Sequence, residues 1–150
     1  MKNYQGVVEM DAVLNVVWEF VQDPDAIGRC MPDVIQYQVL DDHHVHAKVR
    51  VGVGPVRAVF DMETGIKALD EPYQARLNAQ GGGMGSGFQL QSTMHLTEDG
   101  GVVSLNWVAD VGVSGPLATL GGRLLDNQVK KIMAQVFENI RQGVADQLAK

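Results

Sequence analysis

The sequence predicts an α+β fold in which a curved, seven-stranded antiparallel sheet wraps around a long C-terminal helix, with two short helices after the first strand. Two observations predict it. Successive segments in the middle of the chain alternate apolar and polar residues, whereas apolar residues in the last third recur at spacings of three and four. A sheet with one apolar face must bury that face, and the long helix is the available cover.

Length and composition set the broad class. The chain has 150 residues, which fit a single domain over residues 1–150, and 45% are hydrophobic and 20% charged. A net charge of −6 without any run of Lys or Arg argues against nucleic acid and an anionic membrane surface as partners. The single cysteine, Cys30, excludes an internal disulfide. Without a signal peptide or a spanning apolar segment, we expect a cytoplasmic protein with at most peripheral membrane contact.

Two short helices are expected early in the chain. Apolar residues at helical spacing predict the first over residues 12–21, with Asp11 as its N-cap. Asp23 and Pro24 then begin a second helix, in which Asp caps and Pro takes the first helical position, and this helix runs to about Arg29.

Period-two alternation predicts the strands. In residues 44–53, His44, His46, Lys48 and Arg50 share one face and apolar residues the other, as in a strand with one side in water. Gly52-Val53-Gly54-Pro55 and Asp99-Gly100-Gly101 have the composition of turns. The predicted strands cover residues 4–10, 34–40, 44–53, 56–67, 73–80, 88–96 and 102–111.

A glycine-rich stretch, residues 81–87, lies between two of these strands. A phosphate-binding glycine loop needs a helix after it, and here only alternation follows. Its spacing also fails, because Phe88 stands where another glycine is needed and no Lys follows Gly87. We therefore expect a hairpin with bulges or a strongly bent strand pair.

The long helix is predicted to start after Ser114-Gly115-Pro116 and to continue for about 30 residues. Gly121 and Gly122 then fall inside it, where each costs up to ~1 kcal/mol relative to Ala. Either they leave room for a guest or a hinge at a pocket mouth, or they let the helix approach the sheet closely.

Four stretches carry a family resemblance: residues 17–34, 48–61, the glycine stretch before residues 87–90, and residues 115–140. They resemble CoxG, a family named as a subunit of carbon monoxide dehydrogenase, within the Bet v 1-like, START-related (SRPBCC) helix-grip superfamily, over essentially the whole chain. The resemblance implies a non-catalytic protein without a cofactor, encoded beside molybdenum-containing carbon monoxide dehydrogenases or related oxidoreductases. It further implies a role in the assembly or membrane recruitment of those enzymes and in carrying quinone-type lipids.

Two departures from the family are visible. Asp33 stands where the family usually has Gly after Pro32, so we expect a changed turn and added charge near one end of the cavity. Family members often carry a C-terminal tail with a membrane-seeking helix, and this sequence ends at Lys150. We therefore expect a soluble shuttle rather than recruitment through such a tail.

An apolar cavity is expected between sheet and helix, because the inward residues are of medium size with few large aromatics. It would hold a quinone or another lipid-like molecule. The predicted lining residues are Trp18, Met31, Val51, Phe60, Met62, Leu77, Phe88, Met94, Leu105, Trp107, Leu117, Leu120, Gly121, Leu124, Met133 and Phe137.

Reactive side chains are few. The inward polar residues Ser92, Thr64, Tyr73 and Tyr37 have no inward His or carboxylate partner, which argues against acid-base or nucleophilic catalysis. His44 and His46 share a strand face but lack a third ligand, so no metal site is predicted. Cys30 is expected to be a small buried side chain.

Three functions remain open. The first is a non-catalytic carrier of a hydrophobic molecule, and the second is an assembly or docking module with a filled core. Both would serve a molybdenum carbon monoxide dehydrogenase-type oxidoreductase. A weaker third is a polyketide cyclase-like enzyme, which would need inward polar groups.

Overall fold

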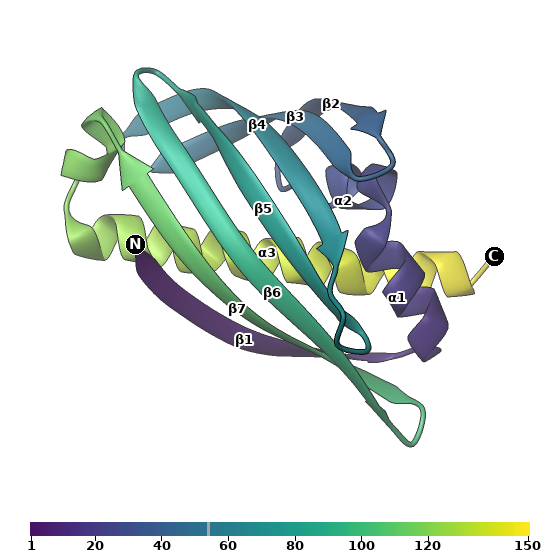
Figure 1. The fold of residues 1–150 in the computed structure, drawn as a ribbon. Helices are drawn as coiled ribbons and strands as arrows, with labels where there is room; N and C mark the ends of the chain where they lie inside the picture. Colours follow the sequence, from purple (N-terminus) through teal and green to yellow (C-terminus); the bar gives the residue numbers. More distant parts are fainter. Residues whose placement is uncertain (54) are drawn as a thin grey trace.

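A computed structural model describes residues 1–53 and 55–150, and it confirms the predicted architecture. One antiparallel sheet has the strand order β1-β7-β6-β5-β4-β3-β2. Figure 1 shows it curved around the long helix α3, with α1 and α2 packed toward the C-terminal end of α3. The elements are β1 Lys2–Asp11, α1 Leu14–Gln22, α2 Pro24–Cys30, β2 Val34–Asp41, β3 His44–Val53, β4 Val56–Ala68, β5 Gln74–Gly83, β6 Ser86–Asp99, β7 Val102–Ser114, the 3-10 helix η1 Pro116–Thr119 and α3 Gly122–Leu148.

The start of α2 is confirmed and the start of α1 was predicted wrongly. Asp23 Oδ1 accepts a hydrogen bond from the Asp25 amide (3.0 Å), and Pro24 takes the first helical position. Asp11, the predicted cap of α1, is instead the last residue of β1, where it pairs with Val102. Strand pairing therefore extends through this residue, and Val13 becomes the N-cap.

Two glycine turns were predicted, and the structure describes one of them completely. Gly100 and Gly101 have φ of +60° and +85° and connect β6 to β7 in a two-residue hairpin closed by the pair Asp99–Val102. The other predicted turn, Gly52–Pro55, includes Gly54, which lies outside the described residues.

The glycine stretch forms a hairpin without a bulge. β5 and β6 pair in unbroken register as far as Gly83 and Ser86, so the bulge alternative was wrong. The glycines allow a close approach instead, because a Cβ at Gly81 would overlap the carbonyl oxygen of Asp61 on β4. This contact presses β5 against β4 at one end of the sheet.

The predicted C-terminal helix is divided into η1 and α3, contrary to expectation. Gly121 is the N-cap of α3 with φ +102°, a left-handed conformation that glycine adopts at little cost. A Cβ added at Gly121 or Gly122 would meet no atom within 4 Å. Neither glycine lies in a helix interior, and neither brings the helix closer to the sheet.

The core lies between the sheet and one face of α3. Met133, Phe137, Ile140 and Val144 are buried residues of that helix face. The Trp107 ring on β7 stacks on Phe137, with centroids 4.7 Å apart and planes 11° apart. No helix in the described part of the chain is long and apolar enough to span a membrane.

Candidate functional site

A cavity of about 160 Å³ lies between the inner face of the sheet and α3. Its wall is apolar on both sides, with Phe60, Met62 and Leu77 from the sheet and Met133 and Phe137 from the helix. A dry apolar space of roughly 150 Å³ can hold one benzene-sized group. The cavity as it stands therefore accommodates a ring or a short stretch of hydrocarbon.

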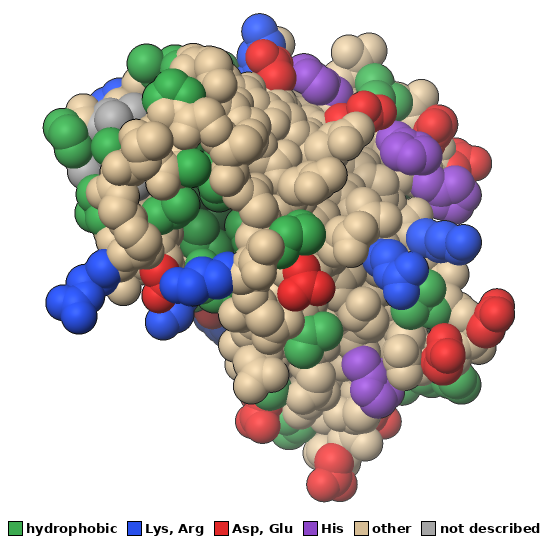
Figure 2. Space-filling model, turned by 60° about the vertical axis from the view of Figure 1, so that its left-hand side comes forward, with side chains coloured by type: hydrophobic (Ala, Val, Ile, Leu, Met, Phe, Trp, Pro, Cys, Tyr) green, Lys and Arg blue, Asp and Glu red, His purple; other side chains and the backbone are tan. Residues whose placement is uncertain are grey.

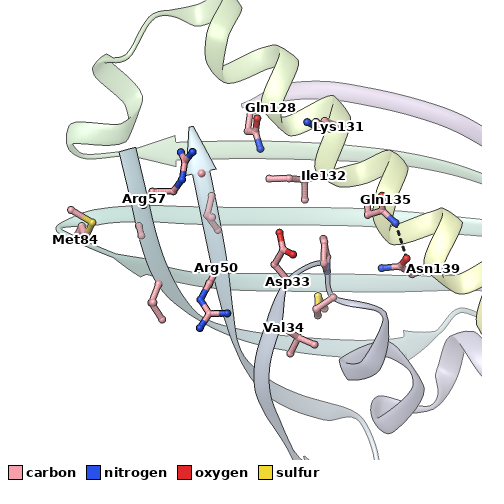
Figure 3. Close-up of a pocket in the computed structure, with 16 residues that line it drawn as sticks. Asp33, Val34, Arg50, Arg57, Met84, Gln128, Lys131, Ile132, Gln135 and Asn139 are labelled. Atoms are coloured by element: carbon pink, nitrogen blue, oxygen red, sulfur yellow. Dashed lines mark hydrogen bonds between the residues drawn. The ribbon is translucent and has the colours of Figure 1, made fainter. Parts of the chain in front are cut away.

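A wider cleft of about 1130 Å³, open to solvent, adjoins the cavity and shares part of its wall. The cleft is bounded by the loop between α2 and β2, by the β3–β4 end of the sheet and by α3 (Figure 3). Figure 2 looks toward the end of the molecule that holds η1 and the hairpin turns, where hydrophobic side chains surround a hollow and Lys and Arg side chains lie beside it. The residues that line both spaces are Met31, Pro32, Asp33, Arg50, Val51, Gly52, Gln128 and Ile132. We refer to this cleft as the entrance.

Hydrogen bonds fix the loop at the entrance. Asn139 Nδ2 on α3 donates to the carbonyl of Cys30 (2.9 Å), the last residue of α2. Gln135 Nε2 donates to Asn139 Oδ1 (2.8 Å), which orients that amide. The Arg50 amide donates to the carbonyl of Asp33 (3.0 Å), joining the loop to β3.

Asp33 has the backbone conformation that glycine prefers. Its φ is +53°, in the left-handed region that Asp and Asn tolerate better than most residues. The side chain lines the entrance, so its carboxylate stands at one end of the cavity, as expected.

Positive side chains dominate the entrance. Arg50, Arg57 and Lys131 line it together with a single carboxylate, Asp33. The chain as a whole has 12 Lys and Arg against 18 Asp and Glu, so the charge balance of this surface is opposite to that of the protein. A local cationic field attracts anions even when the net charge of the protein is negative.

Comparison with known proteins identifies the family. The sequence profile of CoxG, described as a subunit of carbon monoxide dehydrogenase, matches residues 6–145. The chain belongs to the CoxG family. A search of curated proteins by sequence found no match.

Solved structures show the same fold. The chain is similar to a conserved protein from Geobacillus kaustophilus, with a TM-score of 0.85, 20% identity, and coverage of 97% of this chain and 96% of the other. It is also similar to a START superfamily protein from Mycobacterium smegmatis, with a TM-score of 0.71, 16% identity, and coverage of 97% of this chain and 98% of the other. Ara h 8.0201 is similar with a TM-score of 0.63 and 14% identity, and the match covers 97% of this chain and 98% of the other. At these identities the likeness shows the fold alone, which this CoxG-family chain shares with the START superfamily protein and with Ara h 8.0201.

Of the sixteen residues predicted to line a cavity in this CoxG-family protein, ten do so. They are Met31, Val51, Phe60, Met62, Leu77, Phe88, Met94, Leu117, Met133 and Phe137. The other six lie elsewhere. Leu105 is fully buried in the core, Trp107 lies behind Phe137, and Trp18 packs edge-on against Tyr73 with ring centroids 5.7 Å apart. Leu120, Gly121 and Leu124 lie at the η1–α3 junction, outside the cavity wall.

Several lining residues were missed. Leu125 lines the cavity whereas the predicted Leu124 is 41% exposed, an error of one residue in the rotation of the helix. Further along α3, Val129, Ile132, Val136 and Ile140 lie on the cavity side at helical spacing. On the sheet, Ala79, Leu90 and Ser92 share the face that alternation already predicted to be inward. Only the entrance cations had no recognisable sequence signal.

Polar groups inside the cavity are sparse. Ser92 is the one buried polar side chain among the described cavity-lining residues, and its hydroxyl donates to the Val108 carbonyl (3.0 Å). Tyr37 is half-buried, with its ring packed against the core as expected, and its hydroxyl donates to Asp25 (2.9 Å), an exposed carboxylate of α2 rather than an inward one. Burial, followed by this hydrogen bond, raises the pKa of Tyr37.

The other reactive side chains are occupied or shielded. His44 Nδ1 lies 2.8 Å from Asp41, and His46 Nε2 lies 3.3 Å from Asp61. The described residues hold no cluster of three or more His, Cys, Asp or Glu that could bind a metal. Cys30 is buried, and burial raises the pKa of its thiol to about 11 against the opposing effect of Arg29.

Proposed function

We propose that this CoxG-family protein is a non-catalytic carrier that holds a quinone or another lipid-like molecule in the cavity under α3. The observation that carries the proposal is an apolar cavity that shares eight lining residues with an open entrance. We infer that a guest enters the interior through this shared wall. Membership of the CoxG family supports a role as an accessory to a molybdenum carbon monoxide dehydrogenase-type oxidoreductase.

The volumes limit how a guest would bind. Small-molecule sites commonly measure about 300–1,000 Å³, and the inner cavity of about 160 Å³ is smaller than that. A lipid-like guest would place one part in the cavity and the remainder in the entrance, whose volume is about 1130 Å³.

Catalysis has little support from the site. Ser92 is committed to a backbone carbonyl, and among the described cavity-lining residues no His accompanies it. A hydrolase or cyclase requires a positioned base or acid near its reacting group. The docking-module alternative needs no cavity at all, so uptake of a guest decides between it and the carrier.

Native mass spectrometry with short-chain quinones and isoprenoids tests the carrier. We expect one guest per chain and a change in tryptophan fluorescence, because Trp107 stacks on the cavity-lining Phe137. A protein that takes up no guest but forms a complex with the oxidoreductase would be a docking module.

Two variants that introduce the same side chain locate the site. Ala79 lines the cavity, so Ala79→Leu places a larger side chain in that space. Such overpacking costs about 1–3 kcal/mol of stability. Gly122→Leu adds the same side chain where a Cβ meets no atom within 4 Å. We expect Ala79→Leu to weaken uptake at least tenfold and Gly122→Leu to leave it unchanged. The opposite pattern would place the guest outside this cavity.

A further inference from the structure

We propose that Gln128 orients the cargo by donating a hydrogen bond from its side-chain amide to a ring carbonyl of a quinone. The ring then lies at the wall that the cavity and the entrance share, and the isoprenoid tail enters the cavity. This inference rests on the proposed carrier function, to which it adds a specificity-determining residue and a direction of binding.

Gln128 belongs to the face of α3 that covers the cavity. It follows Leu125 by about one helical turn and precedes Ile132 by another, and all three residues line the cavity. Gln128 also lines the entrance, and Figure 3 shows its side chain extending from α3 over that space. The amide therefore lies where the apolar cavity meets the open cleft.

Gln128 is the one side-chain amide of the entrance without a partner among residues 1–53 and 55–150. The other two amides hold the loop, since Gln135 donates to Asn139 and Asn139 donates to the Cys30 carbonyl. Gln128 is half-buried and keeps both its donors and its acceptor available. A few such polar groups in an otherwise apolar site are what fix the orientation of a ligand.

The charged residues of the shared wall suit a carbonyl less well. Asp33 is exposed, and an ionised carboxylate accepts hydrogen bonds but cannot donate one. Arg50 lies on β3 between Val49 and Val51, which face the cavity, so alternation directs the exposed Arg50 side chain to the outer face. Figure 3 shows that side chain extending away from α3. Gln128 is thus the half-buried donor at this wall.

The size and polarity of the cavity decide which end of a quinone enters it. A space of about 160 Å³ takes one benzene-sized group, and an isoprene unit is of that size. A quinone ring inside would bring two carbonyls against an apolar wall whose buried hydroxyl, that of Ser92, already donates to Val108. Burying an unpaired carbonyl is unfavourable. With the tail inside, one carbonyl bonds to Gln128 and the other faces water.

Two guests with the same carbon skeleton isolate the contribution of the carbonyl: a singly prenylated naphthoquinone and the naphthalene that lacks both oxygens. Equilibrium dialysis measures their affinities for the wild type and for Gln128→Met, which keeps a similar length but has no donor. We expect the variant to weaken the quinone about three- to tenfold, because one hydrogen bond is lost, and to leave the hydrocarbon unchanged. Asn127 is exposed and lines neither space, so Asn127→Met is the control and should change neither guest.

A second variant changes the hydrogen bond without changing the size of the side chain. At pH 8 the carboxylate of Gln128→Glu can only accept, as a quinone carbonyl does, whereas the hydroxyls of the reduced quinol donate. We expect this variant to weaken the quinone and to strengthen the quinol, both measured under argon. The ratio of quinone to quinol affinity should fall about tenfold. A purely structural role of Gln128 would leave this ratio unchanged.

The direction of binding has a test of its own. Ala79→Leu narrows the cavity, so it should weaken the prenylated quinone and leave the same quinone without its prenyl group unchanged. Equal weakening of both guests would show that the ring enters first and would overturn the direction.

The outcomes separate this inference from the carrier proposal. If Gln128→Met weakens quinone and hydrocarbon equally, or if Gln128→Glu leaves the quinone-to-quinol ratio unchanged, the hydrogen bond is refuted and the carrier stands. If the wild-type protein binds neither the quinone nor the hydrocarbon, the carrier proposal fails and this inference fails with it.

Discussion

A pair of methionine substitutions tests whether the interior beneath α3 is hollow. Met133 and Met10 are 6% and 5% exposed, and only Met133 borders the cavity. Replacement by Ala removes three heavy atoms beyond Cβ, at about 0.8 kcal/mol each and so about 2.4 kcal/mol. In a fully packed environment, a new void of roughly 70 Å³ at ~24 cal/mol per Å³ adds about 1.7 kcal/mol.

The two substitutions should differ in the part of the stability loss that comes from the new void. Met10 packs within the core cluster, so Met10→Ala should lower the free energy of unfolding by about 4 kcal/mol. One side of Met133 already faces empty space and lacks contacts there, so Met133→Ala should cost about 3 kcal/mol. Urea unfolding measures both losses. A loss for Met133→Ala equal to or larger than that for Met10→Ala would show that the cavity is filled or collapsed in solution.

Three further predictions concern groups outside the cavity wall. Hydrogen bonds, chiefly from Lys2, lower the pKa of Asp126 from 3.8 to about 2. The ionised carboxylate therefore contributes its full stability above pH 4, and this contribution is lost as the pH falls toward 2. Over this range the urea midpoint of Asp126→Asn should fall less steeply than that of the wild type. Cys30, with its pKa raised to about 11, should resist a thiol reagent at pH 8 until urea unfolds the protein, and rapid reaction of the native protein would contradict its burial. Gly115→Ala should cost about 2 kcal/mol or more, because φ is +79° and a Cβ would overlap the Gly85 carbonyl, whereas Gly122→Ala, measured by the same thermal melt, should be neutral or slightly stabilising.

Alternation predicted the sheet well because a one-residue slip would turn every side chain to the opposite face. Val45, Ala47 and Val49 are all buried on β3, as their spacing requires. Local capping chemistry was equally reliable at Asp23, where the side chain and the following proline act within one turn. At Asp11 the same chemistry failed, because pairing with distant Val102 extends the strand.

The cavity wall was predictable on the strands and less so on the helix. The helix begins later than predicted, because η1 ends at Thr119 and Gly121 then caps a separate helix. The rotation of the first turn of α3 places Leu125 rather than Leu124 inward. The two tryptophans were expected to line the cavity. Trp18 instead packs against Tyr73 and Trp107 against Phe137, and neither tryptophan lines the cavity. The cavity wall nevertheless contains three phenylalanines and four methionines, so residue size alone did not decide which side chains line it.

The entrance could not be predicted from single stretches of sequence. Asp33 was expected near one end of the cavity from its place after Pro32, but Arg50, Arg57 and Lys131 come from two strands and a helix and carry no such signal. Their proximity follows from the β3–β4 pairing and from the hydrogen bond between Asn139 and Cys30, which are both consequences of the tertiary fold.

The close approach of β5 to β4 restricts how this protein can diverge. At Gly81 and Gly83 any side chain would collide with the main chain of the neighbouring strand, which cannot move aside as a flexible side chain can. Substitutions in the cavity wall, by contrast, change only the volume and shape of an internal space. Over evolutionary time such a molecule can exchange one cargo for another by ordinary point mutations, while the glycines at the corner of its sheet have no substitute among the other amino acids.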